Sequence, residues 1–404
     1  MVAINRDVVF IRGFQRGAIY DFMNGKVYSI NQIACEIIEK YCKNISLKQA
    51  EKDYLAKLES KGLLQKNWTP TKFIVPQFLP KLKTVWLEIT NKCNLHCVHC
   101  YEGDTHSPLE SPLTLDQWKS LIDQICKVGA ERIIVIGGEP CCCQYAEEIL
   151  TYLTNQKSEN VQVTFFTNAT LLSDDLINLI SRSKISVKIS LYGSTAEIHD
   201  KITRVPGSFD KTIASIYKLV KKGVPVNSAV IAMKENQADI TNMKEFVESI
   251  GVTYSGYDVI RNVFGGSQSE HTPDNKTVLE HSFFSQPSFY ADKTTFYRNA
   301  TVNSCWFGKF AIAENGDVFP CEFERTLKYG NVKNDSIENL LSSRTVKENW
   351  FLSFENIKEC QVCEYRFACK DCRPLGISVR GSLTDKNPRC GYDPYTGTWS
   401  TKTK

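Results

Sequence analysis

Hydrophobic and polar positions in residues 1–65 first follow a strand-like pattern and then a helical one. Residues 8–12 and 18–22 are short apolar runs typical of strands. Asn24-Gly25 separates residues 19–21 from 27–29, which is a strong signal for a two-residue hairpin. Apolar residues then recur at helical spacing at Ile33, Ile37, Ile38 and Tyr41, and again at Leu47, Ala50, Tyr54, Leu55 and Leu58. The pattern predicts a hairpin followed by two helices, a small winged-helix-like α+β domain.

Residues 66–84 carry three prolines and are predicted to be a linker. From residue 85 the pattern changes to short apolar strands that alternate with amphipathic helices. The predicted strands are 85–90, 132–136, 162–167, 185–191, 226–231 and 253–259. Six such units predict an α/β domain over residues 85–260, with a parallel sheet and right-handed crossovers. In such sheets the chemistry lies at the carboxyl ends of the strands.

The last third of the chain has a different character. Residues 261–304 lack a regular pattern and are predicted to form a bridging region. Residues 305–404 have few periodic segments but many cysteines, glycines and turn residues. This composition predicts a small domain that is held together by metal rather than by a large hydrophobic core.

Composition and charge narrow the class of protein. The chain has 404 residues, of which 42% are hydrophobic and 11% aromatic, as in ordinary globular proteins. A net charge of +4 on this length does not suggest a nucleic-acid binder. The chain has no apolar stretch long enough to span a membrane, and its N-terminus lacks a signal-peptide pattern. We therefore expect a cytoplasmic protein with no nucleic-acid and no membrane partner.

The sixteen cysteines are the unusual feature of the composition. In a reducing cytosol, clustered thiols bind metals or take part in chemistry rather than form disulfides. Cys93, Cys97 and Cys100 form a C-x3-C-x2-C motif in the loop after the first predicted core strand. An iron–sulfur cluster normally takes four cysteines, so three of them leave one iron open to another ligand. The spacing favours such a cluster, while zinc with His96 or His99 as a fourth ligand stays the alternative.

Gly137-Gly138-Glu139-Pro140 lies at the end of the second predicted core strand. Glycines at this place let the backbone approach a ligand closely, and the glutamate carboxylate can receive an ammonium group. This motif alone is also typical of a simple strand-ending turn. In combination with the C-x3-C-x2-C motif, however, it resembles the radical S-adenosylmethionine (radical SAM) superfamily.

Further residues agree with this resemblance, which covers residues 85–260. His99 stands where the family usually has an aromatic ring near the adenine. Thr167-Asn168 lies at the end of the third predicted strand, Ser190 lies near the end of the fourth, and Arg204 comes after it. The resemblance implies a partial (β/α)6 barrel.

The resemblance also implies the roles of these residues. The cluster at the three cysteines would bind the amino and carboxylate groups of S-adenosylmethionine. Its reductive cleavage would yield a 5′-deoxyadenosyl radical that abstracts a substrate hydrogen. Gly137, Gly138 and Glu139 would contact the methionine ammonium, Ser190 the ribose or carboxylate, and Arg204 the carboxylate. A strand-end cap and a surface arginine are the alternative interpretations of Ser190 and Arg204.

A second set of cysteines follows in residues 305–390. Ten residues separate Cys305 from Gly316, and four residues separate Gly316 from Cys321. The rest of the set consists of Cys360, Cys363, Cys369, Cys372 and Cys390. Taken alone, the repeated C-x2-C pairs are also a good zinc signal. Next to the first motif, the set resembles a SPASM domain.

The SPASM resemblance implies two auxiliary [4Fe–4S] clusters, and hence three clusters in the whole protein. Cys360, Cys363, Cys369 and Cys390 would bind the outer cluster. Cys305, Cys321 and Cys372 would bind the inner one, which would then have an open iron or a ligand other than cysteine. The family pattern has three residues between its last paired cysteines, whereas only two separate Cys369 from Cys372.

Glu322 directly follows Cys321. In sulfatase-maturing relatives an acidic residue at this place serves as a base. We therefore predict Glu322 as a catalytic base that deprotonates a substrate radical. A solvated surface glutamate is the alternative interpretation.

The N-terminal hairpin and helices resemble the precursor-peptide recognition element of ribosomal peptide biosynthesis, in which a leader peptide adds as a strand to a sheet edge. A small winged helix could instead bind DNA, but no basic recognition helix stands out. Residues 12–21 further resemble SPASM peptide maturases that are encoded with ATP-grasp partners. This resemblance implies an ATP-grasp enzyme of the same pathway as a partner.

Together these observations predict a radical SAM/SPASM peptide maturase, an oxidoreductase that installs a C–C, C–O or thioether cross-link in a ribosomally made precursor peptide. A reducing partner such as flavodoxin or ferredoxin is implied. One alternative is an anaerobic sulfatase-maturating enzyme that forms formylglycine. The alternative from another class is a zinc-stapled, non-catalytic binding protein.

Overall fold

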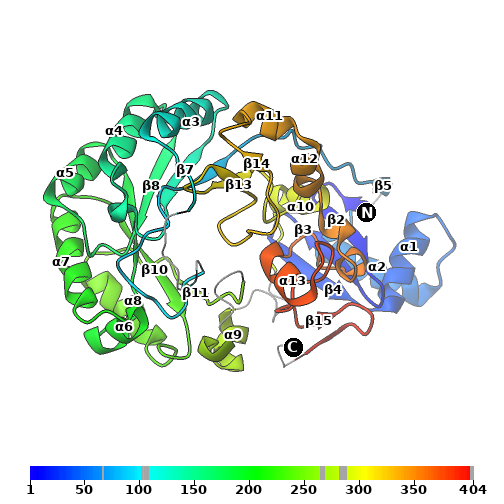
Figure 1. Cartoon of the computed structure of the whole chain (residues 1–404). Coiled ribbons are helices and arrows are strands. Elements are labelled where there is room, and N and C mark those ends of the chain that lie inside the picture. Colours follow the sequence, from blue (N-terminus) through cyan, green and yellow to red (C-terminus); the bar gives the residue numbers. More distant parts are fainter. Residues whose placement is uncertain (66–67, 102, 104–108, 264–268, 282–288, 401–404) are drawn as a thin grey trace. The chain divides into compact units, whose positions relative to one another are not determined.

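The computed structural model describes residues 1–65, 68–101, 103, 109–263, 269–281 and 289–400 (Figure 1). The chain forms two compact units, each assembled from separated segments. Unit 1 comprises Met1–Leu79, Ser282–Phe307 and Glu348–Lys404, and unit 2 comprises Pro80–His281 and Gly308–Lys347. The predicted bridging region and the predicted C-terminal domain are therefore each shared between the two units.

Unit 1 begins with a five-stranded antiparallel sheet in the order β4-β3-β2-β1-β5. The predicted hairpin is confirmed, but its loop has four residues instead of the predicted two. β3 and β4 pair with Asp21 opposite Lys26, and the Asp21 carboxylate accepts hydrogen bonds from the Met23 and Asn24 N–H groups, which favours the longer turn that Gly25 closes with a positive φ. The sequence pattern does not predict β1 or β5, and β5 lies in the segment interpreted as a linker. The strands are β1 (Val2–Asn5), β2 (Val8–Arg12), β3 (Gly17–Asp21), β4 (Lys26–Ile30) and β5 (Thr71–Lys72).

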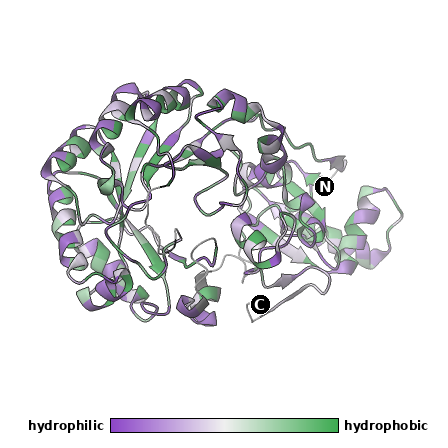
Figure 2. Ribbon diagram, in the orientation of Figure 1, coloured by the Kyte–Doolittle hydropathy of each residue, from purple (hydrophilic) through white to green (hydrophobic). Residues whose placement is uncertain are grey.

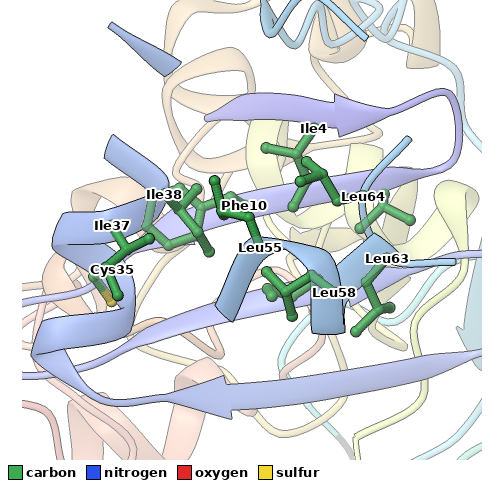
Figure 3. Close-up of a cluster of buried hydrophobic side chains, with 11 residues drawn as sticks. Ile4, Phe10, Cys35, Ile37, Ile38, Leu55, Leu58, Leu63 and Leu64 are labelled. Carbon is green, nitrogen blue, oxygen red and sulfur yellow. The ribbon is translucent and has the colours of Figure 1, made fainter. Parts of the chain in front are cut away.

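Two helices, α1 (Gln32–Cys42) and α2 (Gln49–Ser60), cover one face of this sheet. The side chain of Asn31 accepts a hydrogen bond from the Ala34 N–H and so caps α1. The core beneath the helices is wholly apolar (Figure 3). It contains Ile4, Val8, Phe10, Ile19, Cys35, Ile37, Ile38, Leu55, Leu58, Leu63 and Leu64.

The other face of the same sheet is buried as well. Val9, Ile11, Ala18 and Tyr20 pack against apolar residues of α10 (Lys293–Thr301) and of the cysteine-rich segment. Their partners include Ala291, Phe296, Ala300, Phe367 and Ala368. The N-terminal domain thus shares a hydrophobic core with segments that follow it by more than two hundred residues.

Unit 2 is built around a nine-stranded sheet in the order β11-β10-β9-β8-β7-β6-β12-β13-β14. The six predicted core strands are confirmed as neighbouring parallel strands. They are β6 (Thr84–Glu88), β7 (Arg132–Ile136), β8 (Gln162–Thr167), β9 (Ser186–Ser190), β10 (Val226–Ala232) and β11 (Tyr257–Val259). Parallel β12 (Lys309–Ile312), then antiparallel β13 (Asp317–Phe319) and β14 (Gly330–Asn331), extend this sheet beyond β6.

Helices follow the strands of unit 2 and cover the outside of the sheet (Figure 1). They are α3 (Leu115–Lys127), α4 (Ala146–Gln156), α5 (Asp174–Arg182), α6 (Ala196–Thr203), α7 (Ser208–Lys221) and α8 (Ile240–Ser249). In Figure 2 the strands are largely hydrophobic, whereas the helices carry both hydrophobic and hydrophilic residues. This distribution is expected of amphipathic helices that bury one face. The predicted α/β barrel fold is thereby confirmed.

The remaining elements are short. They are α9 (Asn275–His281), α11 (Ile337–Ser342), α12 (Arg344–Trp350), α13 (Arg373–Arg380), β15 (Tyr392–Asp393) and β16 (Thr398–Trp399). α9 and α10 lie in the segment for which the sequence predicts no regular pattern. In the part of the chain that the structure describes, no helix has the length and apolar character needed to span a membrane.

Candidate active site

A cavity of about 210 Å³ lies at the carboxyl ends of the unit 2 strands. The three cysteines of the first motif line it, together with residues that end β7 to β11. Ten predicted site residues belong to its lining: Cys93, Cys97, His99, Cys100, Gly137, Gly138, Thr167, Asn168, Ser190 and Glu322. This is the edge of a parallel sheet at which catalytic residues are expected.

The loop that carries the three cysteines is held by its backbone. The N–H groups of His96 and Val98 donate to the carbonyls of Thr203 and Ile202 at the end of α6, at 3.0 and 2.9 Å. The Asn94 side chain accepts a hydrogen bond of 3.0 Å from the side-chain amide of Asn168. The loop is therefore anchored to two other strand–helix units.

The thiols of this loop lie in a poorly solvated place. Burial raises the pKa of Cys93 to about 12 and also raises that of Cys97. The charges of Cys93, Cys97 and Cys100 interact with one another, so three bare thiolates would be unstable here. A thiolate is the form that binds iron, and the metal supplies the missing positive charge. The chemistry of this donor set fits an iron–sulfur cluster.

His99 is the aromatic residue of the cavity wall next to Cys100. Its ring stands edge-on to that of Tyr192 at a centroid distance of 4.5 Å. Burial, followed by the charges of His271 and His199, lowers the pKa of His99 to about 4. The ring is therefore neutral at pH 7, and its buried Nδ1 has no hydrogen-bond partner among the described residues. A neutral ring with a free polar atom fits a heteroaromatic ligand such as adenine.

The two glycines of the Gly137-Gly138-Glu139-Pro140 segment are required by protein packing. A Cβ atom at Gly137 would stand 2.3 Å from the Thr90 carbonyl oxygen, and one at Gly138 would stand 2.4 Å from that of Lys92. The backbone N–H of Gly138 donates to the Thr90 carbonyl at 2.8 Å. The glycines therefore allow this segment to approach the loop that leads to Cys93.

Glu139 is fully buried and is not part of the cavity wall. Its carboxylate accepts hydrogen bonds of 2.7 Å from the Thr167 hydroxyl and the Asn168 N–H, and one of 3.1 Å from the Cys141 N–H. Burial raises the pKa of Glu139, while these hydrogen bonds oppose the shift. In this arrangement Glu139 positions Thr167 and Asn168, and its contact with a methionine ammonium stays a prediction.

Two other predicted cofactor residues also lie outside the cavity wall. Pro140 begins a 3₁₀ helix, Pro140–Cys142. Arg204 ends α6 in the left-handed conformation, with φ of 57°, and its charge acts on Cys97. Its predicted contact with a carboxylate is untested by these observations.

Glu322 faces the cavity together with Asp258 and Arg261. Asp258 forms an ion pair with Arg261, whose guanidinium lies 4.5 Å from the Phe323 ring centre. Lys188 on β9 lies 5.3 Å from the centre of the Phe166 ring, which also lines the cavity. Burial lowers the pKa of Lys188, although the carboxylates of Asp258 and Glu322 oppose this shift. The end of the cavity near Glu322 is thus charged, whereas most of its wall is apolar.

Sequence reasoning did not identify Tyr192, Lys188, Asp258 or Arg261 as site residues. Asp258 and Arg261 lie at the carboxyl end of β11, where the strand-end rule would have placed them. Lys188 carries a weaker signal, a charged residue at an inward position of a predicted core strand.

The four predicted ligands of the outer auxiliary cluster lie in unit 1. Their burial raises the pKa of Cys360, Cys363, Cys369 and Cys390, and their charges act on one another. A partly buried set of four interacting thiols fits an iron–sulfur cluster. Among the described residues, no three His, Cys, Asp or Glu side chains are arranged to share a single metal ion.

The predicted ligands of the inner cluster are divided between the units. Cys305 and Cys372 belong to unit 1, and Cys321 belongs to unit 2, where it directly precedes Glu322. The inner cluster therefore stays a prediction.

Comparison with known families matches two parts of this chain. Residues 87–247 match the radical SAM superfamily, and residues 305–373 match the iron–sulfur cluster-binding SPASM domain. Among similar proteins, the AdoMet-dependent heme synthase of Methanosarcina barkeri is 26% identical over 76% of this chain and 95% of its own length. The antilisterial bacteriocin subtilosin biosynthesis protein AlbA of Bacillus subtilis is 26% identical over 72% of this chain and 67% of its own length.

Among solved structures, Streptococcus suis SuiB bound to S-adenosylmethionine has a similar fold. Its TM-score is 0.63 at 15% identity, and the match covers 96% of this chain and all of that chain. At this identity the likeness concerns the fold. With both domain matches in place, and with the cysteines of the first motif in one cavity, the chain is an enzyme of the radical SAM superfamily that carries a SPASM domain.

Proposed function

We propose that this enzyme modifies a ribosomally made precursor peptide and installs a C–C, C–O or thioether cross-link in it. This proposal rests on how much of the chain the structural match covers. A structure of SuiB bound to its precursor peptide SuiA matches 97% of this chain, whereas a structure of native anSMEcpe with bound AdoMet matches 78%. A match over 97% of the chain has to include most of the N-terminal domain. That domain is the part for which a peptide partner is predicted.

The N-terminal sheet offers an edge for such a peptide. β4 is the last strand in the sheet order, and it is hydrogen-bonded to β3 on its inner side. On the outer side of β4, an isolated antiparallel β-bridge joins Tyr290 to Lys26, the first residue of the strand. An extended leader peptide would add beside the following residues as a further strand.

The cavity supplies the chemistry. Cys93, Cys97 and Cys100 would hold the first cluster, while Ser190 and the ring of His99 would orient bound S-adenosylmethionine. When bound, these cofactors supply a 5′-deoxyadenosyl radical that abstracts a hydrogen atom, and the auxiliary clusters accept an electron. Glu322 would take the proton that the substrate gives up, because it is the carboxylate of the predicted set that faces the cavity.

The partners of this reaction follow from its electron balance. Reductive cleavage needs an electron from outside the chain, so a flavodoxin or ferredoxin is proposed as the donor. An ATP-grasp enzyme of the same pathway is proposed as the partner that acts on the same peptide.

One observation favours a second function. Several similar proteins are named as heme synthases, and one of them matches over 95% of its own length. An iron tetrapyrrole is therefore the second candidate substrate. For that substrate the N-terminal domain would have no peptide to bind.

Metal content is the first test. Anaerobically purified protein should contain about twelve irons with matching sulfide, the sum of three four-iron clusters. The Cys93/Cys97/Cys100→Ala triple variant should lose about a third of this iron. About eight irons in the unaltered protein would remove one auxiliary cluster from the scheme. Zinc without iron, even after reconstitution with iron and sulfide, would favour the non-catalytic alternative.

The second test separates the candidate substrates. The full chain is co-expressed with short open reading frames from its own locus, and the peptides are weighed by mass spectrometry. A cross-link removes two hydrogen atoms from the peptide, and the triple variant should not produce this loss. In parallel, absorbance titrations with hemin and with an iron coproporphyrin test the tetrapyrrole. Tight binding and turnover of a tetrapyrrole without any peptide product would overturn the proposal.

A further inference from the structure

A buried arginine lies in the cysteine-rich part of unit 1. The side chain of Arg373, the first residue of α13, is 1% exposed. The SPASM pattern has three residues between its last paired cysteines, so after Cys369 it would place the second of them at residue 373. This chain has arginine there and a cysteine one residue earlier. A cation thus occupies the position at which the pattern has a metal ligand.

The guanidinium of Arg373 is fixed on all sides. It forms a two-pronged ion pair with Asp371, in which Nη2 donates to Oδ1 at 2.8 Å and Nε donates to Oδ2. Nη1 donates to the backbone carbonyls of Leu383 and Asp385, at 2.9 and 2.7 Å. These four hydrogen bonds hold the planar charged group inside the protein.

The two charges of this pair act on different cysteines. The guanidinium of Arg373 acts on the thiols of Cys305 and Cys360. The carboxylate of Asp371 acts on Cys360, Cys369 and Cys390. Other charged groups also act on these cysteines, among them the fully buried Glu364 on Cys363 and the partly buried Lys386 on Cys390. The buried pair is therefore a fixed dipole. Both of its ends act on Cys360, where the negative end has the larger effect, whereas the positive end acts on Cys305 and the negative end on Cys369 and Cys390.

Reduction adds a negative charge to an iron–sulfur cluster, and charges near a cluster change its reduction potential. A buried charge does so strongly, because solvent screens it poorly. We propose that the Arg373–Asp371 pair sets the reduction potentials of the auxiliary clusters, Arg373 raising that of the cluster at Cys305 and Asp371 lowering that of the cluster at the four outer cysteines. This inference rests on the auxiliary clusters of the proposed function.

The test measures the reduction potentials of the auxiliary clusters alone. The Cys93/Cys97/Cys100→Ala full-length chain is reconstituted with iron and sulfide, and its clusters are titrated under mediated redox control by electron paramagnetic resonance. In this background Arg373→Gln should lower the potentials and Asp371→Asn should raise them. Each change should alter the ratio of reduced to oxidised cluster about tenfold at fixed potential, which is about 59 mV for one electron.

Two further variants separate the charge from the fold. Arg373→Lys keeps the positive charge and should leave the potentials near those of the unaltered residue. Arg380→Gln, on the same helix, removes a partly exposed arginine that pairs with Glu359, and should shift the potentials far less. If Arg373→Gln fails to hold iron, the other two variants still test the proposal. The reduction potential should rise in Asp371→Asn and should stay unchanged in Arg373→Lys.

Two outcomes would overturn the proposal in distinguishable ways. Clusters that are retained but keep their potentials, or shift in the same direction in Arg373→Gln and Asp371→Asn, overturn this inference alone. A background variant that binds no iron overturns the auxiliary clusters of the proposed function, and this inference with them.

Discussion

The hydroxyl of Tyr20 donates a hydrogen bond of 2.8 Å to the backbone carbonyl of Glu364, the residue that follows Cys363. Tyr20 belongs to β3 of the N-terminal sheet, so this bond joins the predicted peptide-recognition domain to a predicted cluster loop. The Phe14 N–H donates to the Val362 carbonyl at 2.9 Å and makes a second connection of the same kind. Residues 1–65 alone would expose the apolar face that includes Val9 and Ile11. Binding experiments with a leader peptide therefore need the full chain.

We predict that Tyr20→Phe destabilises unit 1. The substitution keeps the ring but leaves the buried Glu364 carbonyl without this donor, which costs about 1–3 kcal/mol. Denaturant unfolding of the full-length protein measures the loss. Tyr217→Phe is the matched control, because Tyr217 is 56% exposed and its loss should change the free energy of unfolding by less than about 0.5 kcal/mol. Equal losses in both variants would contradict the role given to the Tyr20 bond.

We predict that Gly138→Ala disrupts the first cluster. The added methyl group would meet the backbone oxygens of Lys92 and Asn91, at 2.4 and 2.7 Å, and would push the loop before Cys93 away. Iron content should fall by about a third, one cluster of three, and S-adenosylmethionine binding should be lost in equilibrium dialysis. Gly129→Ala is the control, since a Cβ there meets no atom within 4 Å although φ is 74°. It should cost some stability and keep all the iron.

We predict that His199 makes the protein less stable in acid. Burial lowers its pKa from 6.5 to about 4, although the charge of Asp200 opposes this shift. Between these values the unfolded chain binds a proton that the folded chain does not, so stability falls as the pH falls. The loss from this group is about 1.4 kcal/mol for each pH unit.

His199→Asn has no such group and should show a weaker decline between pH 6.5 and 4.5. Asparagine also keeps an acceptor for the Tyr192 N–H, which donates to His199 Nδ1 at 3.2 Å. Urea unfolding of both proteins at several pH values gives the difference directly. Parallel pH profiles would show that His199 is not the source of the decline.

We predict that Glu322→Gln separates two steps of the proposed reaction. The variant should still form 5′-deoxyadenosine from S-adenosylmethionine, because the cofactor residues are unchanged. Formation of the modified peptide should fall by about 10²–10⁴-fold, the usual contribution of a general base. Glu245→Gln, which alters an exposed glutamate of α8, is the control and should keep both activities. A Glu322→Gln enzyme with full peptide modification would exclude this base.

Local pattern was enough to predict much of unit 2. The strand 132–136 and the strand 162–167 lie where the apolar runs predict them, because alternation and helical periodicity are set by neighbouring residues. The hairpin at Asn24-Gly25 was also predictable, although its loop has four residues and not two. The cysteine spacing together with Gly137-Gly138-Glu139-Pro140 was enough for the radical SAM family.

Long-range pairing was not predictable in this way. The sequence of residues 309–312 does not indicate that they pair with β6 and extend the barrel sheet. Which strand becomes a parallel neighbour depends on the surface that the pairing buries, and local sequence does not show that surface. Similarly, the fit of Tyr20 against the cysteine-rich segment depends on two apolar faces that are separated by more than three hundred residues.

The sequence by itself therefore determined the family, the order of the core strands and the cysteines and carboxylates available for chemistry. Only the tertiary structure decided which of them share a site. In the structure the buried Glu139 carboxylate accepts hydrogen bonds from Thr167 and Asn168, whereas Glu322 and Asp258 line the same cavity. The physical reason is that hydrogen-bond periodicity and side-chain alternation act over a few residues, whereas the convergence of a site depends on how whole surfaces are buried.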